Sequence, residues 1–193
     1  MQISRRSFIL GAGATAASIV LSPATVVAAP QGGHGTYGPE EILEAGHRFF
    51  GSTSQGLAGA VQHLFQNYGE PAGYIVGEEG GGAFIAGLRY GEGMLNTKQA
   101  GTHKIYWQGP SLGWDVGADG ARTMMLVYNL HSVDQVYRRL PGVNGSAYLV
   151  AGAGLSVYGN APLVAPIRTG VGARLGVNLG YLKFTQHPTW NPF

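Results

Sequence analysis

Residues 171–181 alternate strictly between apolar side chains and small or polar ones. One face would carry Val171, Ala173, Leu175, Val177, Leu179 and Tyr181, and the other Gly172, Arg174, Gly176, Asn178 and Gly180. Because successive side chains of a strand point to opposite faces, this period predicts a long strand with one buried face. Glycines along the other face let the strand curve tightly, which favours a closed sheet.

Glycine also punctuates the rest of the chain, with 33 glycines among 193 residues and apolar or aromatic residues interleaved between them. This interleaving indicates turns and bends between strands, with turns expected at residues 80–82, 91, 109–110 and 117–120. The expected strands are residues 74–76, 83–90, 94–97, 104–108, 112–116, 123–129, 147–158, 163–169 and 171–181. Eight or more strands with little helix between them predict a mainly β fold, a small soluble antiparallel β-barrel over residues 72–193.

Helices are expected before the barrel and once within it. A proline followed by two acids at residues 39–41 is typical of a helix start. Ser54 is a candidate cap for a second helix, which ends at Gly69. Residues 39–71 are therefore predicted to be an N-terminal helical segment that packs either outside a sheet or across an opening. One short internal helix is predicted over residues 133–140.

The N-terminal segment 1–28 has the pattern of a twin-arginine export signal. Arg5 and Arg6 precede a mildly apolar run, and small residues close the segment. Cleavage is expected after Ala28, with an uncleaved anchor as the alternative. The twin-arginine machinery exports folded cargo, so the expected location is the periplasm. Residues 29–38 are expected to form a short disordered lead.

Charge and cysteine content restrict the mature protein further. The chain has 12 Lys+Arg and 10 Asp+Glu, and loss of Arg5 and Arg6 with the signal leaves 10 of each. A neutral protein has no electrostatic reason to bind nucleic acid. The chain has no cysteine, so its stability must come from packing and backbone pairing.

An outer-membrane barrel is the alternative to a soluble one. Glycine-rich alternating strands and a C-terminal Phe193 both occur in outer-membrane barrels. However, Pro188 and Pro192 interrupt the terminal segment where a membrane strand should run. Most of the expected strands are also too short and irregular to display a continuous apolar band. We therefore expect a soluble barrel.

Motifs that would carry catalysis or bind a metal are incomplete. Residues 109–113 match the GxSxG nucleophile elbow by letter, but the elbow needs a helix after the serine, and 112–116 reads as a strand. Residues 115–120 resemble the start of a calcium loop, whose closing glutamate position holds Leu126. The six histidines lack metal-ligand spacing. The sequence therefore predicts no enzyme activity, no metal and no cofactor.

Aromatic and charged residues in the expected strands supply the candidate ligand-binding set. The aromatic members are numerous enough to line a face that contacts glycan or lipid. Strand arginines need carboxylate partners when buried, and Glu78, Glu79 and Asp115 are the candidates. The ligand-binding set is Glu78, Arg89, Tyr106, Trp107, Trp114, Asp115, Arg122 and Arg168. The alternative is a packed barrel core with a few internal ion pairs.

Several strings in the chain closely resemble the EipA family of alphaproteobacterial envelope proteins. They are residues 74–93, 100–111, 119–129, 166–170 and 188–193. The resemblance implies a small periplasmic β-barrel needed for envelope integrity and linked to surface polysaccharide and cell division, with no known enzyme activity. A weaker likeness, around residues 77–88 and the glycine-rich C-terminal strands, is to the SYLF lipid-binding domains.

Three functions follow as hypotheses. The leading one is a non-enzymatic periplasmic protein that supports the envelope by binding a glycan, a lipid or a division partner. The second is a carrier of lipid or another hydrophobic ligand, with an open barrel interior and a mouth covered by the N-terminal helices. The third is a cell-wall hydrolase that uses Asp115 or Glu78.

Overall fold

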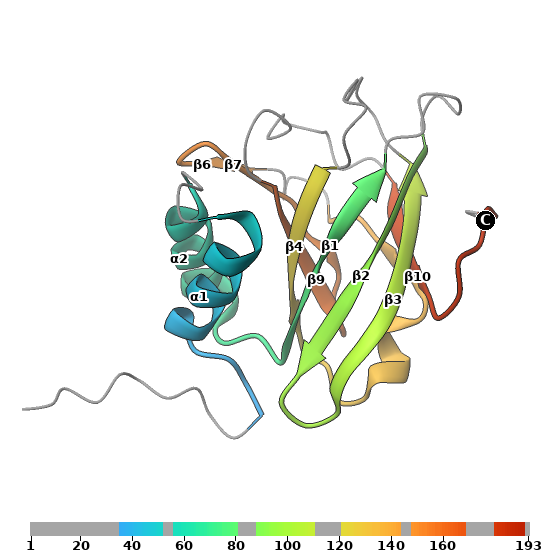
Figure 1. The fold of residues 1–193 in the computed structure, drawn as a ribbon, viewed down its shortest axis with the longest axis horizontal. Helices are drawn as coiled ribbons and strands as arrows, with labels where there is room; N and C mark the ends of the chain where they lie inside the picture. The colour runs from blue at the N-terminus through green and yellow to red at the C-terminus, as the bar shows by residue number, and fades with distance from the viewer. Residues whose placement is uncertain are drawn as a thin grey trace, which may run out of the picture.

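The computed structural model describes residues 35–51, 56–80, 88–110, 121–143, 148–168 and 180–191. Within these ranges, two α-helices lie beside one curled antiparallel sheet (Figure 1). The helices are α1 (Pro39–Phe50) and α2 (Leu57–Tyr68), with a 3-10 helix η1 (Val133–Val136). The strands are β1 (Gly73–Gly80), β2 (Leu88–Thr97), β3 (Gly101–Pro110), β4 (Ala121–Tyr128), β5 (Arg139–Pro141), β6 (Tyr148–Val150), β7 (Ala153–Leu155), β8 (Tyr158–Gly159), β9 (Leu163–Arg168) and β10 (Tyr181–Thr185).

The two N-terminal helices form where the sequence predicts them. Helix α1 begins at the predicted proline, and the Glu41 carboxylate accepts the backbone N–H of Gly38 at 2.8 Å, which satisfies one of the free donors of the first turn. Helix α2 ends before Gly69, as expected. Its predicted cap Ser54 lies outside the described residues. Residues 36–38 are not disordered, because the Tyr37 N–H donates to the Pro71 carbonyl at 2.9 Å.

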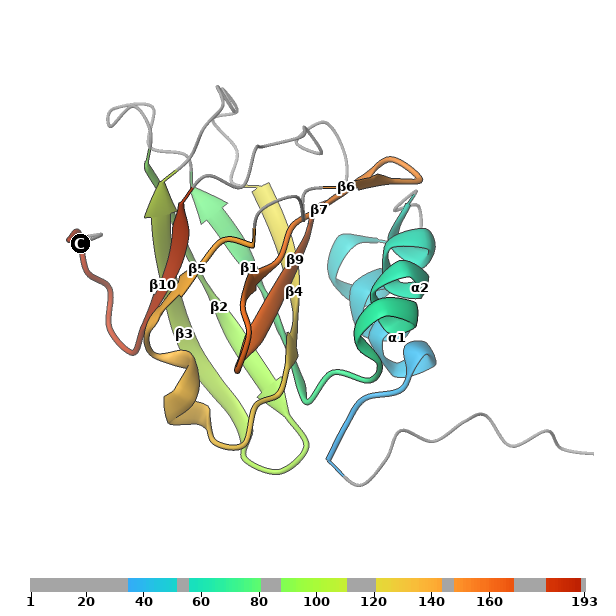
Figure 2. The ribbon, with the colours of Figure 1, turned by 180° about the vertical axis from the view of Figure 1, so that it is seen from behind.

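The sheet curls until its two sides meet. Its strand order is β5-β10-β3-β2-β1-β4-β9-β7-β6, with β8 also paired to β9. A bridge between Gly142 and Tyr158 then joins the end of β5 to β8, and the Val143 N–H donates to the Val157 carbonyl at 3.0 Å. Figure 2 shows β5 and β10 lying across from β4 and β9. The predicted mainly β, antiparallel, barrel-like fold is confirmed.

Two apolar clusters hold this architecture together. The first fills the barrel interior with large side chains from strands on all sides, including Ile75, Leu95, Ile105, Trp107, Met125, Val127, Leu140, Leu182 and Phe184. The second joins both helices to the outer face of β4, β7 and β9. The helices therefore pack outside the sheet (Figure 1), and the hypothesis that they cover a barrel mouth is wrong. No helix in the described ranges is both long enough and apolar enough to cross a bilayer.

Three local predictions are wrong for reasons that the packing explains. The turn predicted at Gly91 does not form, because β2 runs unbroken from Leu88 to Thr97. The helix predicted over 133–140 is only the 3-10 turn η1, and Leu140 enters the barrel core from β5 instead. The strand predicted over 147–158 turns at Ala151 and Gly152, where both residues have positive φ. The predicted strands 112–116 and 171–179 lie outside the described residues.

Candidate functional site

A buried carboxylate lies on the inner face of β1. Ile75, Gly77 and Glu79 alternate with outward-facing residues along this strand, because successive strand side chains point to opposite faces. Ile75 belongs to the apolar core, whereas Glu79 lies near the end of β1 and is only 8% exposed. An ionised carboxylate buried to this extent needs charged or hydrogen-bonding partners.

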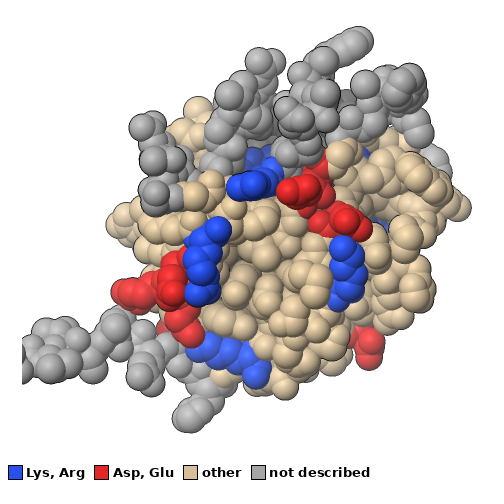
Figure 3. Space-filling view, in the orientation of Figure 1, with Lys and Arg blue, Asp and Glu red and all other residues tan. Residues whose placement is uncertain are grey.

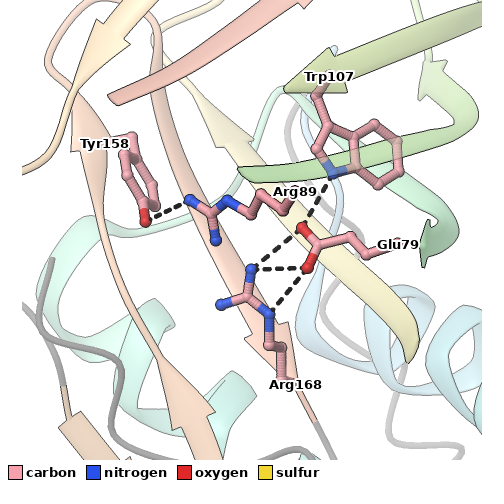
Figure 4. Close-up of polar contacts among 5 residues, drawn as sticks. All are labelled: Glu79, Arg89, Trp107, Tyr158 and Arg168. Atoms are coloured by element: carbon pink, nitrogen blue, oxygen red, sulfur yellow. Dashed lines mark hydrogen bonds and ion pairs between the residues drawn. The ribbon is translucent and has the colours of Figure 1, made fainter. Parts of the chain in front are cut away.

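Arg168 and Trp107 supply those partners from opposite sides of the barrel. The Arg168 Nη2 lies 3.0 Å from Glu79 Oε1 and 2.9 Å from Oε2, and its Nε lies 3.2 Å from Oε2. The Trp107 indole N–H donates to Glu79 Oε1 at 2.9 Å. Figure 4 shows both groups converging on the carboxylate. Paired contacts between a guanidinium and a carboxylate are among the strongest charge-assisted hydrogen bonds in proteins.

A second guanidinium stands next to this ion pair, and the described residues give it no carboxylate of its own. Arg89 of β2 donates from Nη2 to the Tyr158 hydroxyl at 2.7 Å, and its Cζ lies 5.3 Å from the centroid of that ring (Figure 4). Its Nε is buried and has no hydrogen-bond partner. A hydroxyl supplies no carboxylate charge, so within the described residues two guanidinium groups lie beside the single carboxylate of Glu79.

Glycines make room for the Trp107 ring inside the sheet. A Cβ on Gly91 would lie 2.2 Å from Trp107 Cε2, and a Cβ on Gly77 would lie 2.8 Å from Cη2. Both distances are shorter than van der Waals contact. The ring also packs against Phe184, with the ring centroids 6.4 Å apart. Glycine at these two positions therefore lets the indole N–H reach Glu79.

The electrostatics of the cluster keep Glu79 ionised. Burial by itself raises the pKa of this carboxyl. The charges of Arg168 and Arg89, and the hydrogen bonds from Trp107 and Arg168, outweigh that effect and hold the pKa below its usual range. A carboxylate that is ionised and occupied on both oxygens is a poor proton donor and a poor nucleophile. The arrangement is suited to holding charges in fixed positions.

The cluster lies near one end of the barrel. Glu79 is the second-to-last residue of β1, Arg89 is the second residue of β2, and Arg168 is the last residue of β9. These antiparallel strands therefore bring their charged residues to the same end. Residues 81–87, 111–120 and 169–179 continue the chain from this end.

The structure brings together only part of the predicted ligand-binding set. Arg89, Trp107 and Arg168 meet at Glu79, which the predicted set leaves out in favour of Glu78. Glu78 faces outward and is exposed, so the choice between these two neighbours is wrong for an interior site. The alternation that begins at Ile75 is the signal that would have selected Glu79. No sequence signal pointed to Tyr158.

Two other predicted residues lie on the outside of the barrel. Arg122 is exposed, donates to the Phe49 carbonyl at 3.1 Å and lies over the Phe49 ring. Tyr106 alternates with the inward Trp107 and has the Lys104 ammonium 5.4 Å from its ring centroid. The remaining candidates lie outside the described residues; they are Trp114, Asp115 and the signal residues Arg5, Arg6 and Ala28. Among the described residues, no three His, Asp or Glu side chains gather as a metal site would require.

Comparison with known proteins identifies the family and a similar solved structure. The family model described as EipA, envelope integrity protein A, matches residues 35–193. A crystal structure described as a beta-barrel-like, uncharacterised protein from Brucella abortus is 61% identical to this chain. The match covers 83% of this chain and 100% of that one, with a TM-score of 0.77. No curated protein matches this chain.

Proposed function

Since this chain belongs to the envelope integrity protein A family, we propose that it is a non-enzymatic binding protein of the periplasm. In this proposal the twin-arginine signal directs export, and the folded barrel supports the envelope by binding one of its components. The charged cluster at the barrel end is the binding site. The ligand is a glycan, a lipid or a protein partner of the envelope.

The proposal rests on the ionisation and the hydrogen bonding of Glu79. Its two oxygens accept hydrogen bonds from Arg168 and Trp107, and its pKa is held low. General acid catalysis needs a carboxyl whose pKa lies near the working pH. This carboxylate instead fixes one arginine and leaves a second guanidinium, Arg89, as surplus positive charge, which supports recognition over catalysis.

The geometry favours this function over the two alternatives. A hydrolase that pairs Glu78 with Glu79 is disfavoured, because these neighbours face opposite sides of the sheet. Glu92 lies opposite Glu78 on the outer face, but its carboxylate is paired with Lys104 at 3.2 Å. Asp115, the other candidate, lies outside the described residues. An open carrier cavity would need space inside the barrel. The described part of the interior holds the large, buried side chains of Trp107, Phe184 and Leu182 instead.

Complementation of a deletion strain tests the proposal. Loss of the gene should increase sensitivity to detergents and to cell-wall antibiotics, and the wild-type gene should restore resistance. A variant with both Arg5→Lys and Arg6→Lys should leave the precursor in the cytoplasm and fail to complement, because the twin-arginine receptor reads that pair. Unchanged sensitivity in the deletion strain would count against an envelope role.

Native mass spectrometry then asks whether the protein binds a ligand. The protein should be isolated gently from the periplasm of cells that express the full-length gene. A reproducible added mass of glycan or lipid would identify the component, and a bare mass would redirect the search to protein partners.

A further inference from the structure

We propose that Arg89 binds an oxyanion, the carboxylate or phosphate group of an envelope component, at the charged end of the barrel. This inference deepens the proposed function and rests on it. It specifies that the ligand is anionic and that Arg89 binds its charged group.

The charge balance of the cluster is the first argument. Arg168 lies within 3.2 Å of both Glu79 oxygens and neutralises that carboxylate. Within the described residues, Arg89 then remains as one positive charge whose hydrogen-bond partner is a hydroxyl, that of Tyr158. A partly buried charge without a counter-ion is costly because water no longer solvates it fully. An anion that enters the barrel end would remove that cost.

The donor geometry of Arg89 is the second argument. A guanidinium has five N–H donors, and Tyr158 is the acceptor that the described structure gives this one. The buried Nε–H has no acceptor. The fork of parallel N–H groups on a guanidinium matches the paired oxygens of a carboxylate or phosphate. Tyr158 fixes the orientation of the guanidinium through the hydrogen bond and its ring, so the remaining donors are preorganised.

The partial exposure of Arg89 is the third argument. The residue opposite Arg89 on β3 is Gly109, which has no side chain, and the Tyr181 carbonyl oxygen occupies the position that a Cβ would take there. The Nε of Arg89 is buried, but the side chain as a whole is partly exposed and is not sealed within the packed core.

Three basic residues on the outside of the barrel, unlike Arg89, have a carboxylate partner. Arg48 pairs with Glu44, Lys98 with Glu41, and Lys104 with Glu92, at nitrogen to oxygen distances of 2.8–3.2 Å. On the face seen in Figure 3, blue and red groups accordingly lie beside one another. Arg89 differs from these three residues in lying at the barrel end, where its printed hydrogen-bond partner is the Tyr158 hydroxyl.

An NMR titration of the wild-type protein, isolated from the periplasm, tests the proposal directly. The probes are glucuronate, glucose 1-phosphate and, as the matched neutral control, glucose. The Arg89 Nε–Hε resonance is identified by its absence from the spectrum of Arg89→Gln. We expect this resonance to shift saturably with glucuronate or glucose 1-phosphate and not to shift with glucose. A sedimentation assay then compares binding of the protein to phosphatidylglycerol vesicles and to phosphatidylcholine vesicles. Preferential binding to phosphatidylglycerol would show that the anion is a lipid headgroup.

The variants give the size of the effect. Arg89→Gln should weaken binding of the anion at least about tenfold, because a hydrogen bond to a charged group is lost together with the charge. Arg122→Gln is the matched control, since it removes an arginine from the outer face of the barrel. The affinity of this variant for the anion should equal that of the wild type. Arg89→Lys keeps the charge without the fork and should bind with intermediate affinity.

The outcomes separate this inference from the proposed function. Absence of a saturable shift with every anionic probe, or equal affinity in Arg89→Gln and wild type, overturns the inference even if the deletion strain has an envelope defect. A deletion strain without a defect overturns the proposed function even if anions bind. If Arg89→Gln does not fold, the absence of the resonance from the spectrum of Arg89→Lys gives the assignment, and the titration of the wild-type protein still decides the question.

Discussion

Replacement of Glu79 by glutamine should cost about 3–5 kcal/mol in the free energy of unfolding, because it leaves buried charge without a counter-ion. Glutamine has nearly the same shape, and its one carbonyl oxygen still accepts the Trp107 N–H. Arg168 loses a charged acceptor that it contacts at 2.9–3.2 Å, with side-chain exposures of only 19% for Arg168 and 9% for Glu79. Arg89 loses the nearby negative charge of Glu79 as well.

Urea denaturation followed by far-UV circular dichroism measures this change. In a chain of this size the loss corresponds to a fall in Tm of about 10 °C. Glu92→Gln is the matched control: it breaks the ion pair with Lys104 at 3.2 Å, but the two side chains are 60% and 45% exposed. Its expected cost is below about 1 kcal/mol. Equal losses in Glu79→Gln and Glu92→Gln would refute the reasoning, because burial would then have no effect.

A double-mutant cycle separates the ion pair from the rest of the site. Arg168→Met alone leaves Glu79 with only Trp107 and Arg89 nearby. The double variant, Glu79→Gln with Arg168→Met, leaves only Arg89 charged. The double variant should be destabilised by less than the sum of the two single variants, by about 1–3 kcal/mol. Additive losses would show that the two side chains do not act as a pair.

The same carboxylate predicts a pH dependence. Its folded-state pKa lies below the ordinary value near 4.5, so the unfolded chain takes up the proton first as the pH falls. The stabilisation is therefore complete above about pH 5 and is lost as the pH falls toward the folded-state pKa. The pKa of Glu41 is also lowered, by Lys98 and the Gly38 N–H, but this residue is present in both the wild type and Glu79→Gln and does not affect the comparison. The unfolding free energy of wild type should fall more steeply below pH 5 than that of Glu79→Gln.

Two further variants test the packing around the site. Gly91→Ala would place a Cβ 2.2–2.4 Å from three atoms of the Trp107 ring and should cost about 1–3 kcal/mol by urea denaturation, whereas Gly80→Ala, with nothing within 4 Å, should cost less than about 0.5 kcal/mol. An equal effect of the two would contradict the close fit. Gln108→Leu should leave stability unchanged or raise it by about 1 kcal/mol, because this side chain is 2% exposed and neither amide atom has a hydrogen-bond partner. A loss of more than about 1 kcal/mol would show that the amide makes a stabilising contact.

Local chemistry explains which parts of the fold could be predicted from the sequence. The start of α1 depends on a proline and two acids within one turn, and the end of α2 on one glycine, Gly69. Strand patterns and glycine-marked turns likewise locate β3, β4 and β9 without any knowledge of their neighbours. These features depend on residues that are close together in the chain, so they can be predicted from a single sequence.

The errors arise where a distant residue decides the local structure. Gly91 looks like a turn because glycine usually marks one, but it lies within β2 to make room for the ring of Trp107, which comes from β3. The preference for Glu78 over Glu79 has a similar cause, since the predicted strand ended at residue 76 and its alternation was not extended. The contact between Arg89 and Tyr158 joins residues 69 positions apart, and no local pattern reports it.

The cost of a buried ion pair bears on why this barrel contains one. Well-packed apolar residues of similar volume commonly give equal or greater stability than a buried salt bridge. Stability alone therefore does not explain why Glu79 and Arg168 face a barrel interior that is otherwise filled with apolar side chains. The pair does have another consequence: it neutralises one guanidinium and leaves the other, Arg89, charged and held by Tyr158. If the pair serves to position that charge for an anionic ligand, an apolar replacement of Glu79 and Arg168 should fold stably and still fail to complement the deletion strain.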